Sequence, residues 1–312
     1  MFGGLMSKAV DMAVTIAGVN FRSPVIAASG TFGYGVEFEE IIHMEKIGAF
    51  VTKGLSREPM AGNNAPRIIE TSAGMMNAIG LQNMGVRAFC EEKMPVLRRM
   101  QGAVVIANVF GFTKEDCVEV IRVLNDAPGI VMYELNASCP NTSHGGMVFG
   151  TDPDLLGELV YACKRASQRP LLVKLSPNVT SIGTMAKVAE AAGADAVSLV
   201  NTFVSMSIDV ETRRPRIANV TGGLSGPAIK PIAVRMVHEV SKAVRIPVVG
   251  MGGIVRAEDV VEFMLAGATA VEVGTASYAD PRAVEVISNG LRKWCGAHGV
   301  TDVRTLTGGM VR

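Results

Sequence analysis

The sequence predicts an α/β fold of the (β/α)8 TIM-barrel type, in a single domain that spans residues 1–312. Eight short runs rich in apolar and β-branched residues recur along the chain, and a helical pattern follows most of them. These runs lack the alternation of half-exposed strands, which is typical of parallel strands buried on both faces. Eight strand–helix units favour a closed barrel over an open doubly wound sheet, and no G-x-G-x-x-G turn follows the first strand.

The elements follow in order along the chain. The expected strands are PVIAASG (24–30), AFVTKG (49–54), AVVIANVFG (103–111), MYELNAS (132–138), LLVKLSP (171–177), AVSLVNT (196–202), PVVGMGG (247–253) and AVEVGTA (270–276). Helices are expected at 113–126, 152–168, 181–192, 228–243 and 256–266. Thr113 and Asp152 suit N-cap positions, and Gly193 and Gly267 suit left-handed C-terminal positions.

Three segments fall outside this repeat. Residues 11–21 predict a small hairpin that closes the floor of the barrel. Two connections, from about Leu55 to Asn83 and from about Phe203 to Pro227, are too long for ordinary turns. Both follow the C-terminal ends of strands, which is the barrel face that carries active sites. We therefore expect them to be lids or binding loops.

Composition excludes several classes of protein. The formal net charge is +1, so no broad nucleic-acid surface is expected. No apolar stretch is long enough for a membrane span, and no signal peptide is recognisable, which predicts a cytoplasmic protein. The five cysteines show no C-x-x-C spacing. No disulfide framework, metal site or iron–sulfur cluster built by this chain alone is expected.

Polar residues gather where the predicted strands end. Lys53 and Lys174 interrupt apolar strands at equivalent places, and a buried lysine is costly unless it is paired or has a lowered pKa. Because strand ends of a barrel meet at one rim, these side chains are expected to converge with several amides. The expected rim includes Ser29, Lys53, Asn77, Asn108, Asn136, Lys174, Ser176, Asn201 and Thr202.

Glycine-rich strand ends indicate an anion site. The seventh expected strand ends in Gly252 and Gly253, and Gly274 and Thr275 lie at the end of the eighth. In barrels these two loops often present backbone N–H groups to a phosphate. A phosphate next to amides and a lysine suits flavin mononucleotide, with Lys174 favouring negative charge on the reduced ring.

Cys139 lies in the polar segment NASCPNTSHGG, residues 136–146. It could be a buried packing residue, a nucleophile paired with His144, or an acid/base group. The paired lysines and the double glycine cradle favour the acid/base role, because a cysteine hydrolase needs neither. The other four cysteines lie in helical patterns and are expected to be packing residues.

Five motifs together carry a family resemblance. They are TSAGMMNAIGLQN (71–83), NASCPN (136–141), VKLSPN (173–178), LVNT (199–202) and GMGGI (250–254). In combination the chain resembles the class 1 dihydroorotate dehydrogenases from about residue 14 onward, and GLQN is more similar to class 1B than to class 1A. The membrane-bound class 2 enzymes carry Ser in place of Cys139.

The resemblance implies FMN-dependent oxidation of (S)-dihydroorotate to orotate in pyrimidine (UMP) biosynthesis, with one FMN per chain. It implies that Cys139 removes the proton from ring carbon 5, that a hydride passes from carbon 6 to flavin N5, and that Lys53 supplies positive charge. The implied substrate contacts are Lys53, Asn77, Ala78, Ile79, Gly80, Leu81, Asn136, Asn201 and Thr202. The implied FMN contacts are Ser29, Lys53, Gly54, Asn108, Asn136, Lys174, Val200, Gly226, Gly252, Gly253, Gly274 and Thr275.

The resemblance also implies partners. Class 1B enzymes pass electrons to a subunit that carries FAD and an iron–sulfur cluster, and from there to NAD, in a heterotetramer built on a homodimer core. One departure is visible, because Gly54 and Leu55 follow Lys53 where the family commonly has Thr residues. That difference leaves local loop contacts open.

Four alternatives stay open at this point. Two are enzymes of related chemistry: a fumarate-using class 1A homodimer and a dihydropyrimidine dehydrogenase-like subunit. A third is a cysteine hydrolase that uses Cys139 and His144. The fourth is a non-catalytic sensor of a phosphate-bearing ligand.

Overall fold

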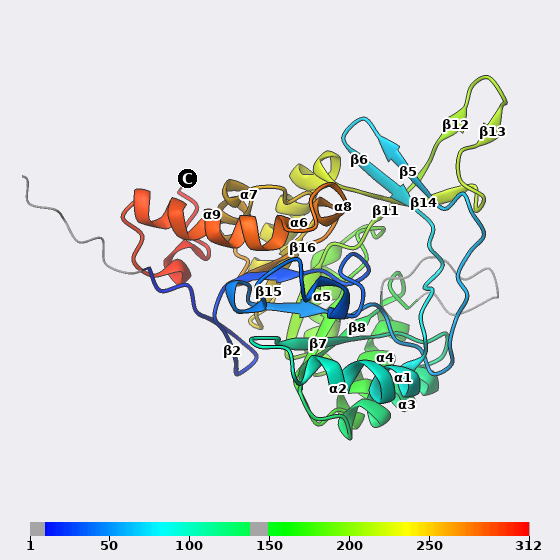
Figure 1. Cartoon of the computed structure of the whole chain (residues 1–312), viewed down its shortest axis with the longest axis horizontal. Helices are drawn as coiled ribbons and strands as arrows, with labels where there is room; N and C mark the ends of the chain where they lie inside the picture. Colours follow the sequence, from blue (N-terminus) through cyan, green and yellow to red (C-terminus); the bar gives the residue numbers. More distant parts are fainter. Residues whose placement is uncertain (1–9, 138–148, 312) are drawn as a thin grey trace, which may run out of the picture.

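The computed structural model describes residues 10–137 and 149–311, which form the predicted closed parallel barrel (Figure 1). Its strands follow one another around the barrel in chain order, and the last pairs with the first. They are β3 (Val25–Ala27), β4 (Ala49–Val51), β7 (Val105–Val109), β8 (Ile130–Asn136), β9 (Leu171–Lys174), β10 (Ala196–Leu199), β15 (Val248–Met251) and β16 (Ala270–Val273). The fold predicted from the sequence is confirmed. Most strands end before the predicted runs do, because the polar rim residues leave the ladder.

Helices surround the barrel, with their apolar faces packed on the strands. They are α1 (Val86–Ala88), α2 (Met94–Leu97), α3 (Lys114–Asn125), α4 (Pro153–Ala166), α5 (Ile182–Ala191), α6 (Lys230–Ala243), α7 (Ala257–Leu265), α8 (Ala276–Ala279) and α9 (Ala283–Ala297), with a π-helix, Phe89–Lys93, between α1 and α2. Thr113 and Asp152 are N-caps as predicted, since their side chains accept from backbone N–H groups of the first turn. Gly193 and Gly267 have φ values of 99° and 120°, the predicted left-handed geometry. Short 3-10 helices cover Val36–Phe38, Met44–Lys46, Pro227–Ile229 and Val303–Leu306.

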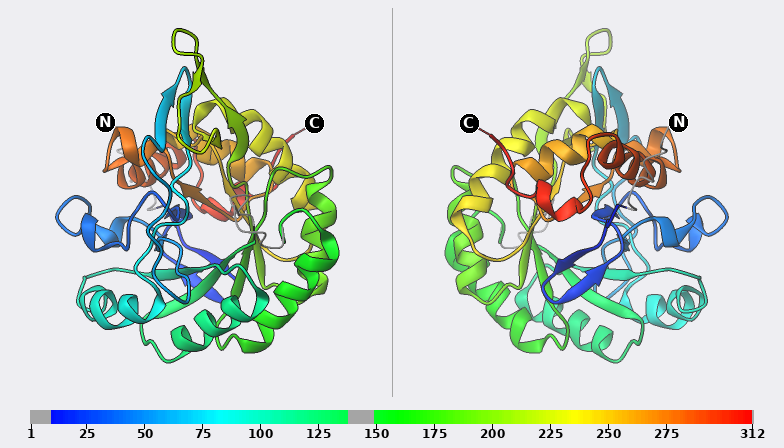
Figure 2. Two further views of the ribbon diagram at one scale, coloured as in Figure 1. Left: turned by 90° about the vertical axis from the view of Figure 1, so that its right-hand side faces the viewer. Right: turned by 90° about the vertical axis from the view of Figure 1, so that its left-hand side faces the viewer.

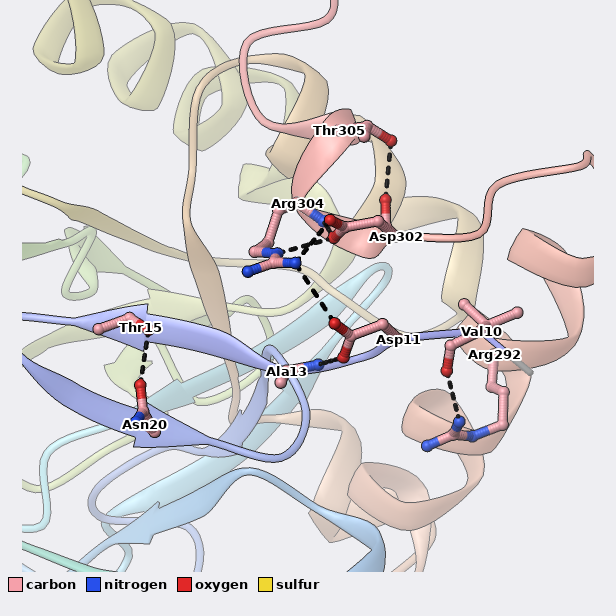
Figure 3. Close-up of polar contacts among 9 residues, drawn as sticks. All are labelled: Val10, Asp11, Ala13, Thr15, Asn20, Arg292, Asp302, Arg304 and Thr305. Atoms are coloured by element: carbon pink, nitrogen blue, oxygen red, sulfur yellow. Dashed lines mark hydrogen bonds and ion pairs between the residues drawn. The ribbon is translucent and has the colours of Figure 1, made fainter. Parts of the chain in front are cut away.

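The predicted N-terminal hairpin is present, and Figure 2 (right) shows it across one end of the barrel. Strands β1 (Val14–Ile16) and β2 (Val19–Phe21) pair antiparallel and bury Ile16 and Phe21 in the main core. Its start is held by the C-terminal part of the chain (Figure 3): Asp11 lies 3.3 Å from Arg304, and Arg292 donates to the carbonyl of Val10. The hairpin therefore has the structural role expected of it.

The two long connections combine into one structure that the sequence did not predict. Residues 55–83 supply β5 (Ile68–Thr71) and β6 (Gly74–Asn77), and residues 203–227 supply β11 (Phe203–Met206) and β14 (Thr221–Ser225). These strands form an antiparallel sheet in the order β11-β14-β6-β5, here called the roof sheet. A short ribbon of β12 (Ile208–Asp209) and β13 (Arg214–Pro215) extends beyond it (Figure 1). The roof sheet lies beside the C-terminal ends of the barrel strands.

Four cysteines lie on helices, as expected. Cys117, Cys163 and Cys295 are buried, and Cys90 is half-buried. Burial raises the pKa of the Cys90 and Cys295 thiols, which makes them less reactive. Among the described residues no helix is both long enough and apolar enough to span a membrane. No group of three or more potential metal ligands was found in the same ranges.

Candidate active site

A cavity of about 230 Å³ lies between the C-terminal ends of the barrel strands and the roof sheet. Met75 and Asn77 of β6, together with Gly223 and Ser225 of β14, form its roof-sheet side. The sheet made from the two long connections therefore encloses the predicted site, which explains why those connections are long.

The cavity brings together all of the predicted site residues except Ala78, Ser176 and Cys139. Those lining it are Ser29, Lys53, Gly54, Asn77, Ile79, Gly80, Leu81, Asn108, Asn136, Lys174, Val200, Asn201, Thr202, Gly226, Gly252, Gly253, Gly274 and Thr275. Ala78 is an exception, because it is buried in a small separate cluster with Met76 and Ile217. Ser176 is buried, and its hydroxyl accepts from the backbone N–H and the side-chain amide of Asn178. Cys139, like His144, lies outside the described residues. The roles of all these residues stay predictions.

Lys53 projects into the cavity just after β4. Its side chain makes no hydrogen bond or ion pair with another residue of the described ranges. Burial lowers the pKa of Lys53, and the neighbouring Arg67 lowers it further, while Glu37 raises it. A half-buried ammonium group without a carboxylate partner is a suitable contact for an anionic ligand.

Lys174 is paired more closely than the sequence suggested. Its ammonium nitrogen lies 3.6 Å from Oε1 of Glu134 and 3.6 Å from Oε2 of Glu272, and it donates to Oγ of Ser29 at 3.3 Å. Burial by itself would lower the pKa of Lys174, but the two carboxyl groups outweigh it and raise the pKa above 10.5. Lys174 is therefore charged inside the barrel.

The two glutamates differ in their surroundings. Asn108 donates to Oε1 of Glu134 at 2.6 Å, and Ser198 donates to Oε2 at 3.0 Å. Neither carboxyl oxygen of Glu272 has a hydrogen-bond partner in the described part of the chain. Burial, and then the proximity of Glu134, raises the pKa of Glu272 well above 4.5, although Lys174 opposes this shift.

A network of amides positions the polar rim on the side of β9 and β10. Asn178 donates to the carbonyl of Thr202 at 3.1 Å and accepts from the backbone N–H of Val204 at 3.0 Å. Asn201 accepts from the N–H of Thr202 and donates to Asn136 at 3.5 Å. The start of β11 is thus tied to the end of β9, and Thr202 is held at the cavity wall.

The glycine-rich loops present backbone donors to the cavity. The N–H groups of Gly253 and Thr275 donate to no other residue in the described ranges. Gly253 has a φ of 80°, and a Cβ at this position would lie 2.8 Å from the carbonyl oxygen of Gly226. The loop therefore requires glycine. Unpaired N–H groups at a cavity wall favour an anion, because a buried backbone donor otherwise goes unsatisfied.

Sequence reasoning missed the two glutamates. Both lie in the middle of apolar strands, in MYELN and AVEVG, where their placement parallels that of Lys174 in LLVKLS. The argument applied to the lysines, that a charge within a buried strand needs a partner, would have found Glu134 and Glu272 as well. Asn178 was missed because its role depends on tertiary contacts.

The fold and the cavity are those of a (β/α)8-barrel enzyme, with lysines and unpaired backbone N–H groups at the C-terminal ends of the strands. The family model for dihydroorotate dehydrogenase matches residues 11–294. The chain therefore belongs to the dihydroorotate dehydrogenase family, as the motifs indicated, and is an oxidoreductase of a family that implies a flavin cofactor.

Individual relatives agree with this assignment. The chain is 58% identical over 298 residues to a protein of Solibacter usitatus provisionally named dihydroorotate dehydrogenase A (fumarate), covering 96% of this chain and 98% of the relative. It is 54% identical, with the same coverage, to the dihydroorotate dehydrogenase B (NAD(+)) catalytic subunit of Pelobacter propionicus. A solved structure of DHODH from Eimeria tenella in complex with ferulenol matches with a TM-score of 0.81 at 22% identity, covering 99% of this chain and 91% of that one. This last match supports the fold.

Proposed function

We propose that the chain oxidises (S)-dihydroorotate to orotate with FMN, as the catalytic subunit of an NAD-linked enzyme. The observation that carries the proposal is the convergence of Lys53, Lys174, several amides and the unpaired N–H groups of Gly253 and Thr275 on one cavity. A hydrolase that uses a thiol and an imidazole has no need of this set.

The residues present fit FMN. Gly253, after β15, and Thr275, after β16, offer N–H donors for the phosphate, and a Cβ at Gly253 would lie 2.8 Å from the carbonyl oxygen of Gly226. Asn108 and Lys174, which also line the cavity, would provide an amide and a charge for the ring. The chemistry that bound FMN supplies is hydride acceptance. Ser29, Gly54, Val200, Gly226, Gly252 and Gly274 complete the lining that would hold it.

The substrate would lie between the amides and Lys53. The amides of Asn77, Asn136 and Asn201 and the hydroxyl of Thr202 would orient the pyrimidine ring, while Lys53 would pair with the carboxylate. Backbone groups of Ile79, Gly80 and Leu81 would enclose it. Cys139 would take the proton from carbon 5 as general base.

The names of the relatives support the NAD-linked type. Relatives between 52% and 54% identical, including that of Trichlorobacter lovleyi, carry the name of the B-type (NAD(+)) catalytic subunit. The 58% identical relative carries the fumarate name, so a fumarate-using homodimer is the second candidate. In the NAD-linked form, FAD and an iron–sulfur cluster would belong to a partner subunit.

The roof sheet offers a surface for a homodimer core. Val204, Met206 and Ile208 are each about half exposed on or beside its edge strand β11, at 53%, 50% and 52%. Exposed apolar side chains on an unpaired edge are typical of protein contacts. A homodimer that buries this edge, with the electron-transfer subunits outside, would give the heterotetramer.

Absorbance spectroscopy tests the proposal. The protein purified alone should show flavin bands that bleach on anaerobic addition of dihydroorotate but not of dihydrouracil. Co-expression with its electron-transfer partner should add iron–sulfur absorption and NAD-dependent turnover. A colourless protein, or one bleached by dihydrouracil alone, would contradict it. Turnover with fumarate and no NAD-dependent activity would favour the second candidate.

A further inference from the structure

A buried charge cluster lies at the base of the cavity, formed by Glu134 of β8, Lys174 of β9 and Glu272 of β16. Glu134 and Glu272 have no exposed side-chain surface, and the Lys174 side chain is 6% exposed. Lys174 and Glu272 also line the cavity. The charges of this buried cluster therefore act on any ligand that is bound in the cavity.

The hydrogen bonds distinguish the two carboxyl groups. Both oxygens of Glu134 accept from neutral donors, Asn108 and Ser198, which stabilise an ionised carboxylate. Glu272 accepts from no described residue. Its register partners on the neighbouring strands are Ile26 and Met251, both apolar, so neither adjacent strand supplies a donor or a cation.

In the part of the chain that the structure describes, Lys174 is the one cation that pairs with either acid. If both were ionised, the cluster would carry a net charge of −1, with one carboxylate buried and unsatisfied, which is the costliest arrangement. A single proton on Glu272 leaves an ion pair of Lys174 with Glu134 and a neutral acid.

We propose that Glu272 is a protonated carboxylic acid in the folded enzyme, and that it keeps the cluster at the cavity neutral. Glu272 is thus a positioning residue for charge and not a reacting group. The effect on the cofactor rests on the proposed function: an ionised Glu272 would place a negative charge beside the ring and disfavour its reduction. With Glu272 protonated, the charges of Lys174 and Glu134 balance each other and the cluster adds no net charge to the cavity.

Infrared spectroscopy tests the proton directly and needs no bound flavin. At neutral pH the protein should show the carbonyl band of an un-ionised carboxyl group, shifted by ¹³C-glutamate labelling and absent in Glu272→Gln. Glu285→Gln is the matched control, because Glu285 is ion-paired with Lys46 and its variant should retain the band. Absence of the band from the parent protein would overturn the proposal, even if neither variant folds.

The midpoint potential of the bound flavin gives a second readout. Glu272→Gln replaces one neutral group by another, so the potential should stay unchanged. Lys53→Met, which removes a unit charge from the same cavity, should lower it and shows that the assay responds to charge. A rise in potential in Glu272→Gln would overturn the proposal. A protein that binds no flavin would refute the proposed function, while the infrared result would still decide where the proton lies.

Stability assigns the proton to one of the two acids. Glu272→Gln should resist urea at neutral pH at least as well as the parent. Glu134→Gln should unfold at a lower urea concentration, because Asn108 and Ser198 lose part of their acceptor. The reverse order of the two variants would place the proton on Glu134 and overturn the assignment.

Discussion

Replacing Lys174 by Met should destabilise the fold by roughly 3–5 kcal/mol, because it leaves Glu134 as a buried charge without a counter-ion. The distance of 3.6 Å between the Lys174 ammonium nitrogen and Oε1 of Glu134 leads to an energy of the same size. At an effective dielectric constant of about 20, two unit charges at that distance attract by about 4–5 kcal/mol. The side chain of Lys174 is only 6% exposed, so solvent screens the pair weakly. Met fills a similar volume, which limits any loss of packing.

The assay is urea unfolding of the parent, Lys174→Met, Glu134→Gln and the double variant at neutral pH. The double variant should recover much of the loss, since no unpaired charge remains. The pKa of Lys174 lies above 10.5 in the folded protein, so its contribution is complete below 10.5 and is lost as the pH rises through the folded pKa. A loss below about 1 kcal/mol, or a double variant no more stable than Lys174→Met, would refute the reasoning, because an exposed ion pair behaves that way.

Three further predictions follow from the site. Cys139→Ala should retain flavin but slow its reduction by dihydroorotate by about 10²–10⁴-fold in stopped-flow measurements, and an unchanged rate would remove Cys139 from the mechanism. In Gly223→Ala the new Cβ would lie 2.0 Å from Oγ1 of Thr202, so the KM for dihydroorotate should rise about tenfold or more. Gly296→Ala is the control and should leave KM unchanged, because a Cβ there meets no atom within 4 Å. Equal KM values for the two variants would show that the cavity wall shifts to accommodate the methyl group. The pKa of Glu272 is raised well above 4.5, so the contribution of its carboxyl group to folding stability is present below pH 4.5 and is lost as the pH rises toward the folded pKa. The melting temperature of Glu272→Gln should therefore rise relative to that of the parent as the pH increases from about 4.5. Melting temperatures that follow parallel pH profiles would contradict the raised pKa of Glu272.

The barrel could be predicted because each of its units is local. The residues of LLVKLSP are enough to predict a strand at that place, and Asp152 followed by Pro153 is enough to predict the start of a helix. The rim followed from topology alone, since parallel strands in a closed barrel bring their C-terminal ends together. Strands distant in the sequence, such as those bearing Lys53 and Thr275, could thus be placed at one cavity without knowledge of any contact.

The roof sheet and the acid–lysine cluster could not be derived in this way. β6 pairs with β14, and neither segment shows in its own sequence that the other is its partner. A charge within a buried strand shows that Glu134 and Glu272 each need a partner, but the sequence does not show that one lysine on another strand lies beside both. Ala78 belongs to a motif whose neighbours line the cavity, but its own side chain points into a separate apolar cluster.

The pairing of β6 with β14 also constrains the order in which the molecule is assembled. The two strands come from connections after the second and the sixth barrel strands, so joining them closes a very long stretch of chain. That closure is entropically costly until neighbouring strands already hold the ends near each other. During synthesis, most of the polypeptide must therefore have left the ribosome before the roof sheet can form over the cavity. The nascent protein cannot enclose a ligand until then.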